Sequence, residues 1–248
     1  MARTKTDKAD KTDALLIARS CALHRPQPWA PPAPEMGHLQ ALVRRLKSLT
    51  EMRQMEHNRK DVSPEAVRAS VEAVLAVLDE QIAQTRQRIR DHIGTSPTLR
   101  GRRDLLTSIP ANAVGHIGEA TAAALLAEIG DVSQFAGARQ VAAFAGLVPR
   151  VRQSGQWKGH VRLSKVGSGR LRHALYFPAL AALRSNPLLQ ALRQRLLGAG
   201  KSKMLIVGAA MRKLLTLAFG VLKSGQPFDP NYGPSGGPKT RQPAASGA

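Results

Sequence analysis

The chain has 248 residues, and its 37 Lys and Arg against 17 Asp and Glu give a formal net charge of +20. One cysteine, Cys21, excludes a disulfide framework and a multi-cysteine metal site. The sequence has neither an apolar run of about 18 residues nor a basic-then-apolar leader, so we expect no membrane partner, no secretion and a cytoplasmic location. Aromatic residues make up 4% of the chain, and Ala, Leu and Arg are abundant, which predicts a mainly α fold.

The positive charge is concentrated in the second half of the chain. Sixteen of the 17 acidic residues lie between Asp7 and Asp131, whereas residues 132–228 contain 16 Lys and Arg and no Asp or Glu. Cations without acidic partners bind nucleic-acid phosphates, and each such contact makes binding salt-dependent. A solubilising surface is the alternative, although such surfaces usually mix both signs. Because the stretch has no carboxylates, chemistry within it would have to use Ser, His, Lys, Arg or Tyr.

The chain begins with two short segments of different composition. Residues 1–22 alternate Lys and Asp and then become apolar, which predicts a helix. Residues 23–34 include five prolines, which predicts an extended linker that ends the first element.

A helical hairpin is predicted over residues 35–94. Apolar residues recur there every three or four positions, on both sides of a turn at 61–65, as in an antiparallel coiled coil. We expect Ser63 to cap the second helix, Pro64 to occupy its first position and Gly94 to end it. Simple packing explains such a pattern, and the hairpin would act as a spacer or in dimerisation.

Residues 95–223 predict a second helical region, with a polar, glycine-rich middle at 150–172. A small-residue helix is expected at 119–129, and apolar stripes predict further helices up to Leu222. Residues 224–248 are rich in Pro, Gly and Ser, which predicts a disordered tail.

Two helices joined by a glycine-bearing turn are predicted at 104–130, with Gly115 and Gly118 in the turn. Such a turn can direct backbone N–H groups and a helix N-terminus at a phosphate, as in a helix-hairpin-helix DNA contact. A plain turn between two helices is an equally good interpretation of the spacing.

Ser154 is the candidate nucleophile, because it lies in a basic segment. Cations on both sides would stabilise the charge that develops when a hydroxyl attacks a phosphate. Ser164 and Ser168 are rivals, and a basic surface loop with a structural serine is the alternative. His160 and His173 lack the spacing of a metal pair. The expected contacts to the nucleic acid are Arg150, Arg152, Trp157, Lys158, Arg162, Lys165, Arg170 and Arg172.

Two carboxylates near the N-terminus, Asp10 and Asp13, share a helix face at i and i+3 and could hold a divalent metal. Two are too few for a phosphoryl-transfer site, so they form at most an incomplete one. A solvated Lys/Asp helix start is the alternative.

Several short motifs occur in an order that resembles the insertion-sequence-110 family of transposases, with its relatives 116 and 902. Between residues 106 and 222 these are Ile109-Pro110, residues 121–131, Phe135, residues 143–149, Gln153-Ser154-Gly155, Gly159 and residues 167–172. Residues 10–19 resemble the last acidic motif of the same family's DEDD nuclease-like domain. The linker and the helical hairpin between these regions fit the same order.

The resemblance implies DNA strand cleavage and rejoining, directed by an element-encoded guide (bridge) RNA, on double-stranded DNA. It implies that a serine matching Ser154 forms a covalent link to DNA, and that four acidic residues bind Mg²⁺, two of them matching Asp10 and Asp13, with Asp7 as a register alternative. It implies a DEDD remnant at 1–22, a linker at 23–34, a coiled coil at 35–94 and a transposase C-terminal domain at 95–223.

The chain also departs from the family pattern. The family's first two acidic positions lie upstream of the motif at residues 10–19, and we expect this chain to lack them; residues 111–114 also separate the glycines from Ile109-Pro110. We therefore expect a shortened transposase, inactive alone, that forms homo-oligomers or pairs with a full-length transposase. The alternatives are a non-catalytic DNA- or RNA-binding regulator of intact transposase and a generic helix-hairpin-helix repair accessory.

Overall fold

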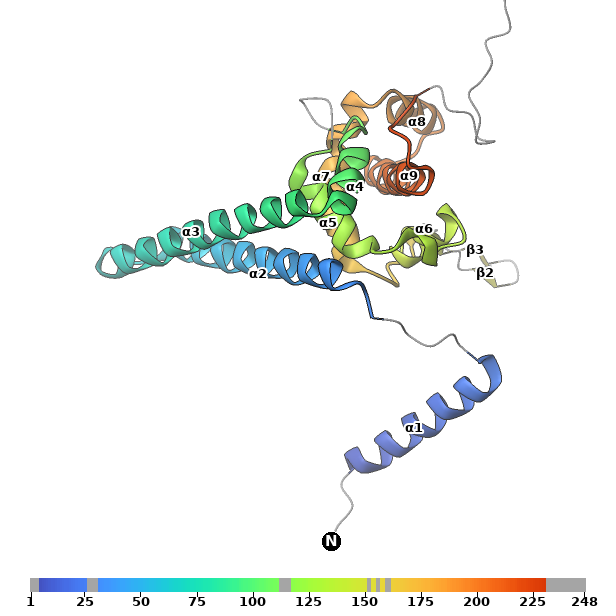
Figure 1. Cartoon of the computed structure of the whole chain (residues 1–248), viewed down its shortest axis with the longest axis horizontal. Helices are drawn as coiled ribbons and strands as arrows, with labels where there is room; N and C mark the ends of the chain where they lie inside the picture. The colour runs from blue at the N-terminus through green and yellow to red at the C-terminus, as the bar shows by residue number, and fades with distance from the viewer. Residues whose placement is uncertain are drawn as a thin grey trace, which may run out of the picture. The chain divides into compact units, whose positions relative to one another are not determined.

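A computed structural model of the chain describes residues 5–25, 31–111, 117–150, 153–154, 157–158 and 162–230. The chain divides into two compact units, Met1–Pro32 and Ala33–Ala248. In the first unit, helix α1 spans Lys5–His24 (Figure 1). Its side chains are exposed from residue 10 onward, and they include the apolar Leu15, Leu16, Ile17 and Leu23.

In the second unit, helices α2 (Pro34–Val62) and α3 (Glu65–Thr95) pack against each other as a helical hairpin, here called the stem (Figure 1). Leu49 of α2 and Ile82 and Ile89 of α3 are buried, which accounts for the apolar spacing in the sequence. The helical hairpin expected from that spacing is therefore present.

The turn of the stem differs in detail from the prediction. Pro64, not Ser63, is the N-cap of α3, and no side chain caps that helix. The Ser63 hydroxyl instead donates to the carbonyl O of Arg59, at 2.7 Å, so Ser63 closes α2. Gly94 lies inside the last turn of α3, which runs on to Thr95, because the ~1 kcal/mol cost of a helical glycine does not outweigh packing.

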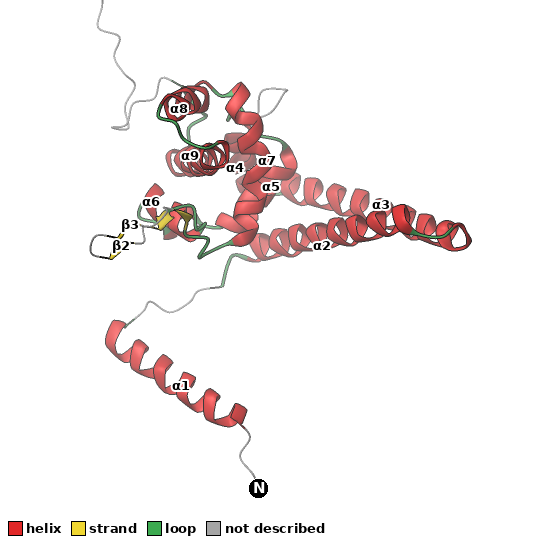
Figure 2. Cartoon of the chain, turned by 180° about the vertical axis from the view of Figure 1, so that it is seen from behind, coloured by secondary structure: helices red, strands yellow, loops and turns green. Residues whose placement is uncertain are grey.

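The other elements of the second unit form a helical head, and Figure 2 shows its few strands beside α6. The elements are α4 (Pro97–Thr107), α5 (Glu119–Ile129), the 3-10 helix η1 (Val132–Gln134), α6 (Ala138–Phe144), β1 (Pro149–Arg150), β2 (Gln153–Ser154), β3 (Trp157–Lys158), β4 (Arg162–Leu163), α7 (Gly169–Ser185), α8 (Pro187–Gly198) and α9 (Lys203–Ser224). The predicted mainly α class is confirmed.

Helix α9 is central to the core of the head. It contacts α4, α6, α7, α8 and η1, and Ala210, Leu214 and Ala218 are fully buried. Among the described residues it is the one helix long and apolar enough to cross a membrane, yet 61% of that span is buried inside the head. Its apolar character is accounted for by packing.

The stem and the head share a core. Leu39 of α2 and Ile93 of α3 belong to the same buried cluster as Leu106 of the head. At the junction, the Ser96 hydroxyl donates to a carboxylate oxygen of Glu35 at 2.7 Å. The stem therefore meets the head through a packed joint, which fixes the side chains on either side of it.

A buried asparagine ties together segments of the head that are far apart in sequence. The Asn186 side chain is fully buried, and its amide donates to the carbonyl O of Pro110 at 3.1 Å. Its side-chain oxygen accepts from the N–H groups of Leu188 and Leu189, which caps α8. This network explains why a polar side chain is tolerated in the core.

Candidate nucleic-acid interface

The basic segment that carries Ser154 contains a β-hairpin, which the sequence did not predict. Strands β1 and β4 pair antiparallel, with Arg150 opposite Arg162. Strands β2 and β3 also pair antiparallel, with Ser154 opposite Trp157. Two residues join β2 to β3, so the backbone of Ser154 lies directly next to the tip of the hairpin. A serine at this place is carried on paired strands instead of a free loop.

Two glycines shape the base of this hairpin. Gly146 has φ +66°, and a Cβ there would lie 2.6 Å from the carbonyl O of Val166. Gly167 has φ +123°, and a Cβ there would clash with the carbonyl O of Phe144. Both conformations favour glycine, and both sites admit no side chain. The base of the hairpin is therefore built by close backbone contact between the ends of α6 and β4.

Hydrogen bonds reinforce this contact. The N–H of Ser168 donates to the carbonyl O of Phe144 at 2.8 Å, and the N–H of Lys165 donates to that of Gly146 at 3.1 Å. Lys165 has φ +57°, an uncommon conformation for a residue with a side chain. The strained backbone and the exposed cation at the same position are compatible with a contact to a phosphate.

One carboxylate anchors the start of α7. Glu128 of α5 has a side chain only 8% exposed, and it forms an ion pair with Arg170 at 2.6 Å. Its other oxygen accepts from the Ser168 hydroxyl at 3.0 Å, while Ser168 caps α7 by accepting from the N–H of Leu171. Sequence reasoning missed Glu128, although its place just before the acid-free stretch was a usable signal.

Arg172 also serves the base of the hairpin. Its guanidinium donates to the carbonyl O of Ala145 at 2.9 Å and to that of Gly167 at 3.3 Å. Together with the Arg170 ion pair, these bonds show that two of the cations expected to contact nucleic acid make hydrogen bonds within the chain. Their predicted contact with phosphate stays a prediction.

The other expected contacts fall in different places. Arg150 is exposed in β1, and the backbone of Trp157, Lys158 and Arg162 lies in β3 and β4. Arg152, with Gly115 of the glycine turn, lies outside the described residues.

The glycine turn joins α4 to α5, two helices that contact each other. Gly118 is the N-cap of α5 with φ −69°, and nothing lies within 4 Å of the place a Cβ would take. The position therefore does not require glycine. The described part of this connection is held by the N–H of Ile117, which donates to the carbonyl O of Ile109 at 2.8 Å, and both side chains are buried.

Asp10 and Asp13 do not make a metal site by themselves. Both are exposed on α1, and the described residues contain no group of three or more His, Cys, Asp or Glu arranged to hold a metal ion. Magnesium in phosphoryl-transfer sites needs more oxygen ligands than two carboxylates on one helix face provide. The described residues therefore do not fit the metal that the resemblance implies.

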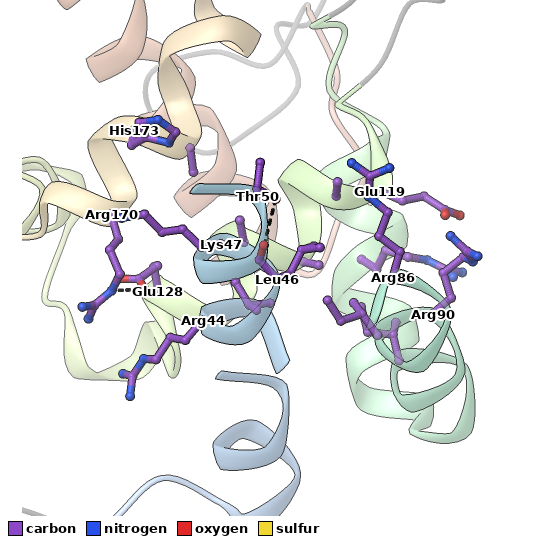
Figure 3. A pocket seen from close by; sticks show the side chains of 18 residues that line it. Arg44, Leu46, Lys47, Thr50, Arg86, Arg90, Glu119, Glu128, Arg170 and His173 are labelled. Atoms are coloured by element: carbon purple, nitrogen blue, oxygen red, sulfur yellow. Dashed lines mark hydrogen bonds and ion pairs between the residues drawn. The ribbon is translucent and has the colours of Figure 1, made fainter. Parts of the chain in front are cut away.

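A cleft lies where the stem meets the head, next to the Glu128–Arg170 ion pair (Figure 3). Its volume is about 550 Å³. Cations from four helices line it, namely Arg44 and Lys47 of α2, Arg86 and Arg90 of α3, Arg103 of α4 and Arg170 of α7. Sequence analysis missed this cluster, because most of its members come from the part of the chain whose total charge is nearly balanced.

Comparison with known proteins is consistent with the motifs in the hairpin region. The model of the family described as "Transposase IS116/IS110/IS902 family" matches residues 103–194. The chain is 34% identical over 229 residues to the "Pilin gene-inverting protein" of Moraxella bovis, covering 92% of this chain and 69% of that protein. It is 43% identical over 68 residues to the "Transposase for insertion sequence element IS1111A" of Coxiella burnetii, covering 27% of this chain and 19% of that protein.

The family model and the Moraxella bovis relative define the class as transposases, which recombine DNA. The chain belongs to the IS116/IS110/IS902 family of transposases.

Proposed function

We propose that the chain binds DNA as part of an insertion-sequence transposase and that Ser154 is the nucleophile that joins protein to DNA. The observation that carries the proposal is the position of Ser154 next to the tip of a hairpin whose base is fixed by backbone contacts. A nucleophile must be held in place to attack efficiently, and the pairing of Ser154 with Trp157 would hold its backbone.

In the proposed step, the hydroxyl of Ser154 attacks a phosphodiester of the DNA. The Oγ–P bond forms as the P–O bond to the leaving strand end breaks, the serine proton passes to solvent, and the leaving oxygen takes up a proton. Exposed cations beside the hairpin, such as Arg150 and Lys165, would stabilise the negative charge on the phosphate.

The rival serines support this assignment. The Ser168 hydroxyl already donates to Glu128 and accepts from the N–H of Leu171, so it is engaged in the architecture. The N–H of Ser164 donates to the carbonyl O of Val148 at 2.8 Å, at the base of the hairpin away from its tip.

The finer parts of the proposal follow the family. A guide RNA would direct the reaction, and the chain would be inactive alone, since Asp10 and Asp13 supply two of the acidic residues that the reaction needs. It would act with copies of itself or with a full-length transposase that carries the remaining acids. The Moraxella bovis relative is named for inverting a pilin gene, and any inversion of a gene requires DNA strands to be cut and rejoined.

The test is a search for a covalent protein–DNA adduct. The chain is mixed with an intact homologous transposase, its guide RNA and donor DNA, and adducts are separated under denaturing conditions. We expect an adduct on this chain that is lost in Ser154→Ala and kept in Ser164→Ala. An adduct that survives Ser154→Ala, or none with the wild-type chain while the homologue reacts, would contradict the proposal.

A non-catalytic regulator is the second candidate, and the stem favours it. Several apolar stem side chains are exposed, among them Met55 at 59%, Val67 at 48% and Val77 at 59%. Such residues could pair with the stem of an intact transposase. Salt-dependent binding of DNA or RNA without any adduct, together with co-purification with the homologue, would favour the regulator over the enzyme.

A further inference from the structure

Apolar and cationic residues line the cleft between stem and head; the apolar ones are here called its floor and the cations its rim. Ala120, Ala123 and Ala124 of α5 contribute small side chains to the floor. Six cationic side chains line the cleft against two carboxylates, Glu119 and Glu128, an excess of four positive charges. Figure 3 shows the joined pair Arg170 and Glu128 on one side and Arg86 and Arg90 on the other.

The ion pairs of the described residues leave much of this charge uncompensated. Three of the six cations have acidic partners: Arg170 pairs with Glu128, Arg103 with Asp104, and Lys47 with Glu51 in an exposed i, i+4 contact of little strength. Arg44 is exposed and has no hydrogen bond or ion pair to another described residue. The rim therefore provides free cations held by helices that are fixed at a packed joint.

We infer that this cleft binds a single-stranded segment of nucleic acid, with phosphates at the rim and sugars or unstacked bases against the floor. The inference rests on the proposed function, because it assigns a further contact to a nucleic-acid-binding transposase. A cavity of about 550 Å³ has the size of a small-ligand site. A duplex keeps its bases stacked inside and cannot insert apolar groups into such a cavity, whereas a single strand can.

Charge argues against the other occupants available to this chain. A second copy carries the same net charge of +20 and offers no excess of negative charge. Helix α1 contains three Asp against three Lys and one Arg, so it does not complement the rim either. A phosphodiester strand is complementary, and the lack of aromatic side chains in the cleft predicts binding that depends on salt more than on base identity.

The test compares two double variants that remove the same charge from the same helices. Arg44→Gln with Arg90→Gln removes two cations that line the cleft, whereas Arg45→Gln with Arg88→Gln removes exposed cations of α2 and α3 that do not line it. Binding of the full chain is measured by fluorescence anisotropy, with single-stranded DNA and RNA of one sequence and with the matching duplex DNA.

We expect the cleft variant to bind both single strands roughly tenfold more weakly and to lower the salt slope by about 1.4, at about 0.7 per phosphate contact. The control should stay within about twofold of the wild type, and duplex binding should change equally little in both variants. A loss with DNA alone or RNA alone would identify which strand the cleft takes. Equal losses in the two variants, or an equal loss with the duplex, would overturn the inference.

A third variant tests the floor without changing charge. Ala120 is exposed on α5, and Ala120→Leu keeps a strong helix former while filling the cleft. We expect weaker binding of single strands with an unchanged salt slope, and unchanged binding would contradict a role for the floor. All binding is repeated in Ser154→Ala, so that loss of adduct chemistry and loss of cleft binding are recorded separately.

Discussion

The stem and the head differ in how many of their charged side chains form ion pairs. Of the seven ion pairs among the described residues, five lie in the stem, including Arg53–Asp79 and Lys60–Glu72 between α2 and α3. In the acid-free half, the one such pair uses Glu128 from outside that half. The comparison teaches that cations of the acid-free half have few acidic partners among the described residues, which leaves them available to a polyanion.

The stability of the head should depend on close backbone contacts far more than that of the stem does. Gly167→Val tests this at the tightest of these contacts. The new Cβ would clash with the carbonyl O of Phe144 at a φ of +123°. We expect a loss of at least about 3 kcal/mol in the free energy of unfolding, measured in urea. Gly220→Ala is the control, because that exposed helical site in α9 has open space, and it should stabilise by up to about 1 kcal/mol. Equal stability of the two variants would contradict the conclusion that close backbone contacts at Gly167 hold the base of the hairpin.

Breaking the buried hydrogen-bond network around Asn186 should cause the second-largest loss in the free energy of unfolding. Asn186→Leu keeps the branched shape of the side chain but leaves the carbonyl O of Pro110 and the N–H groups at the start of α8 without partners. We expect a loss of about 2–4 kcal/mol. The same change at Asn58 in the stem, where the side chain is exposed, should cost less than about 0.5 kcal/mol. A mild effect at Asn186 would show that the network is replaceable by water.

Glu128→Gln should lower the stability less than Asn186→Leu does. It compares a partly buried ion pair of the head with an exposed ion pair of the stem. The amide loses the charge that holds Arg170, whose own side chain is half exposed and partly solvated. We expect a loss of about 1–2 kcal/mol. Glu51→Gln in the stem, whose partner Lys47 is also exposed, should be near neutral. If calorimetry gave the same melting temperature shift for both, Glu128 would have no special role.

The smallest effect should come from acid titration of the stem. A hydrogen bond from Arg53 lowers the pKa of Asp79, so the folded state holds the charged carboxylate more strongly than the unfolded state does. The resulting stability is present above the ordinary Asp pKa and is lost as the pH falls through the lowered value. The difference in melting temperature between the wild type and Asp79→Asn should therefore exist at neutral pH and fade in acid. A difference that grew on acidification would contradict this sign.

The sequence predicted the helices that have a periodic pattern of apolar residues. Stripes such as Leu49 and Ile82 marked the stem, and Gly130, with φ +66°, ends α5 where expected. It missed the strands around Ser154, because two-residue strands have no periodicity to detect. It also missed Asn186 and Glu128, whose partners lie 76 and 40 to 42 residues away and cannot be inferred from local spacing.

The sequence indicated which segment carries the candidate site, but not which side chains the fold brings together there. The lack of acidic residues singled out the basic segment that contains Ser154 and Lys165, and its role at the site stays a prediction. It did not mark Arg44 or Arg90, which the folding of the stem onto the head brings to one cleft. Nor could spacing show that Arg172 donates to backbone carbonyls at the base of the hairpin.

The salt dependence of DNA binding by the full chain tests the central claim most directly. Arg150→Gln with Lys165→Gln removes two exposed cations beside the hairpin, whereas Arg59→Gln with Arg68→Gln removes two stem cations that pair with glutamates. The account predicts that the head variant lowers the slope of log affinity against log salt by about 1.8, at about 0.9 per phosphate contact, and that the stem variant leaves it unchanged. Equal changes in both variants, or no binding of the wild type at low ionic strength, would contradict it.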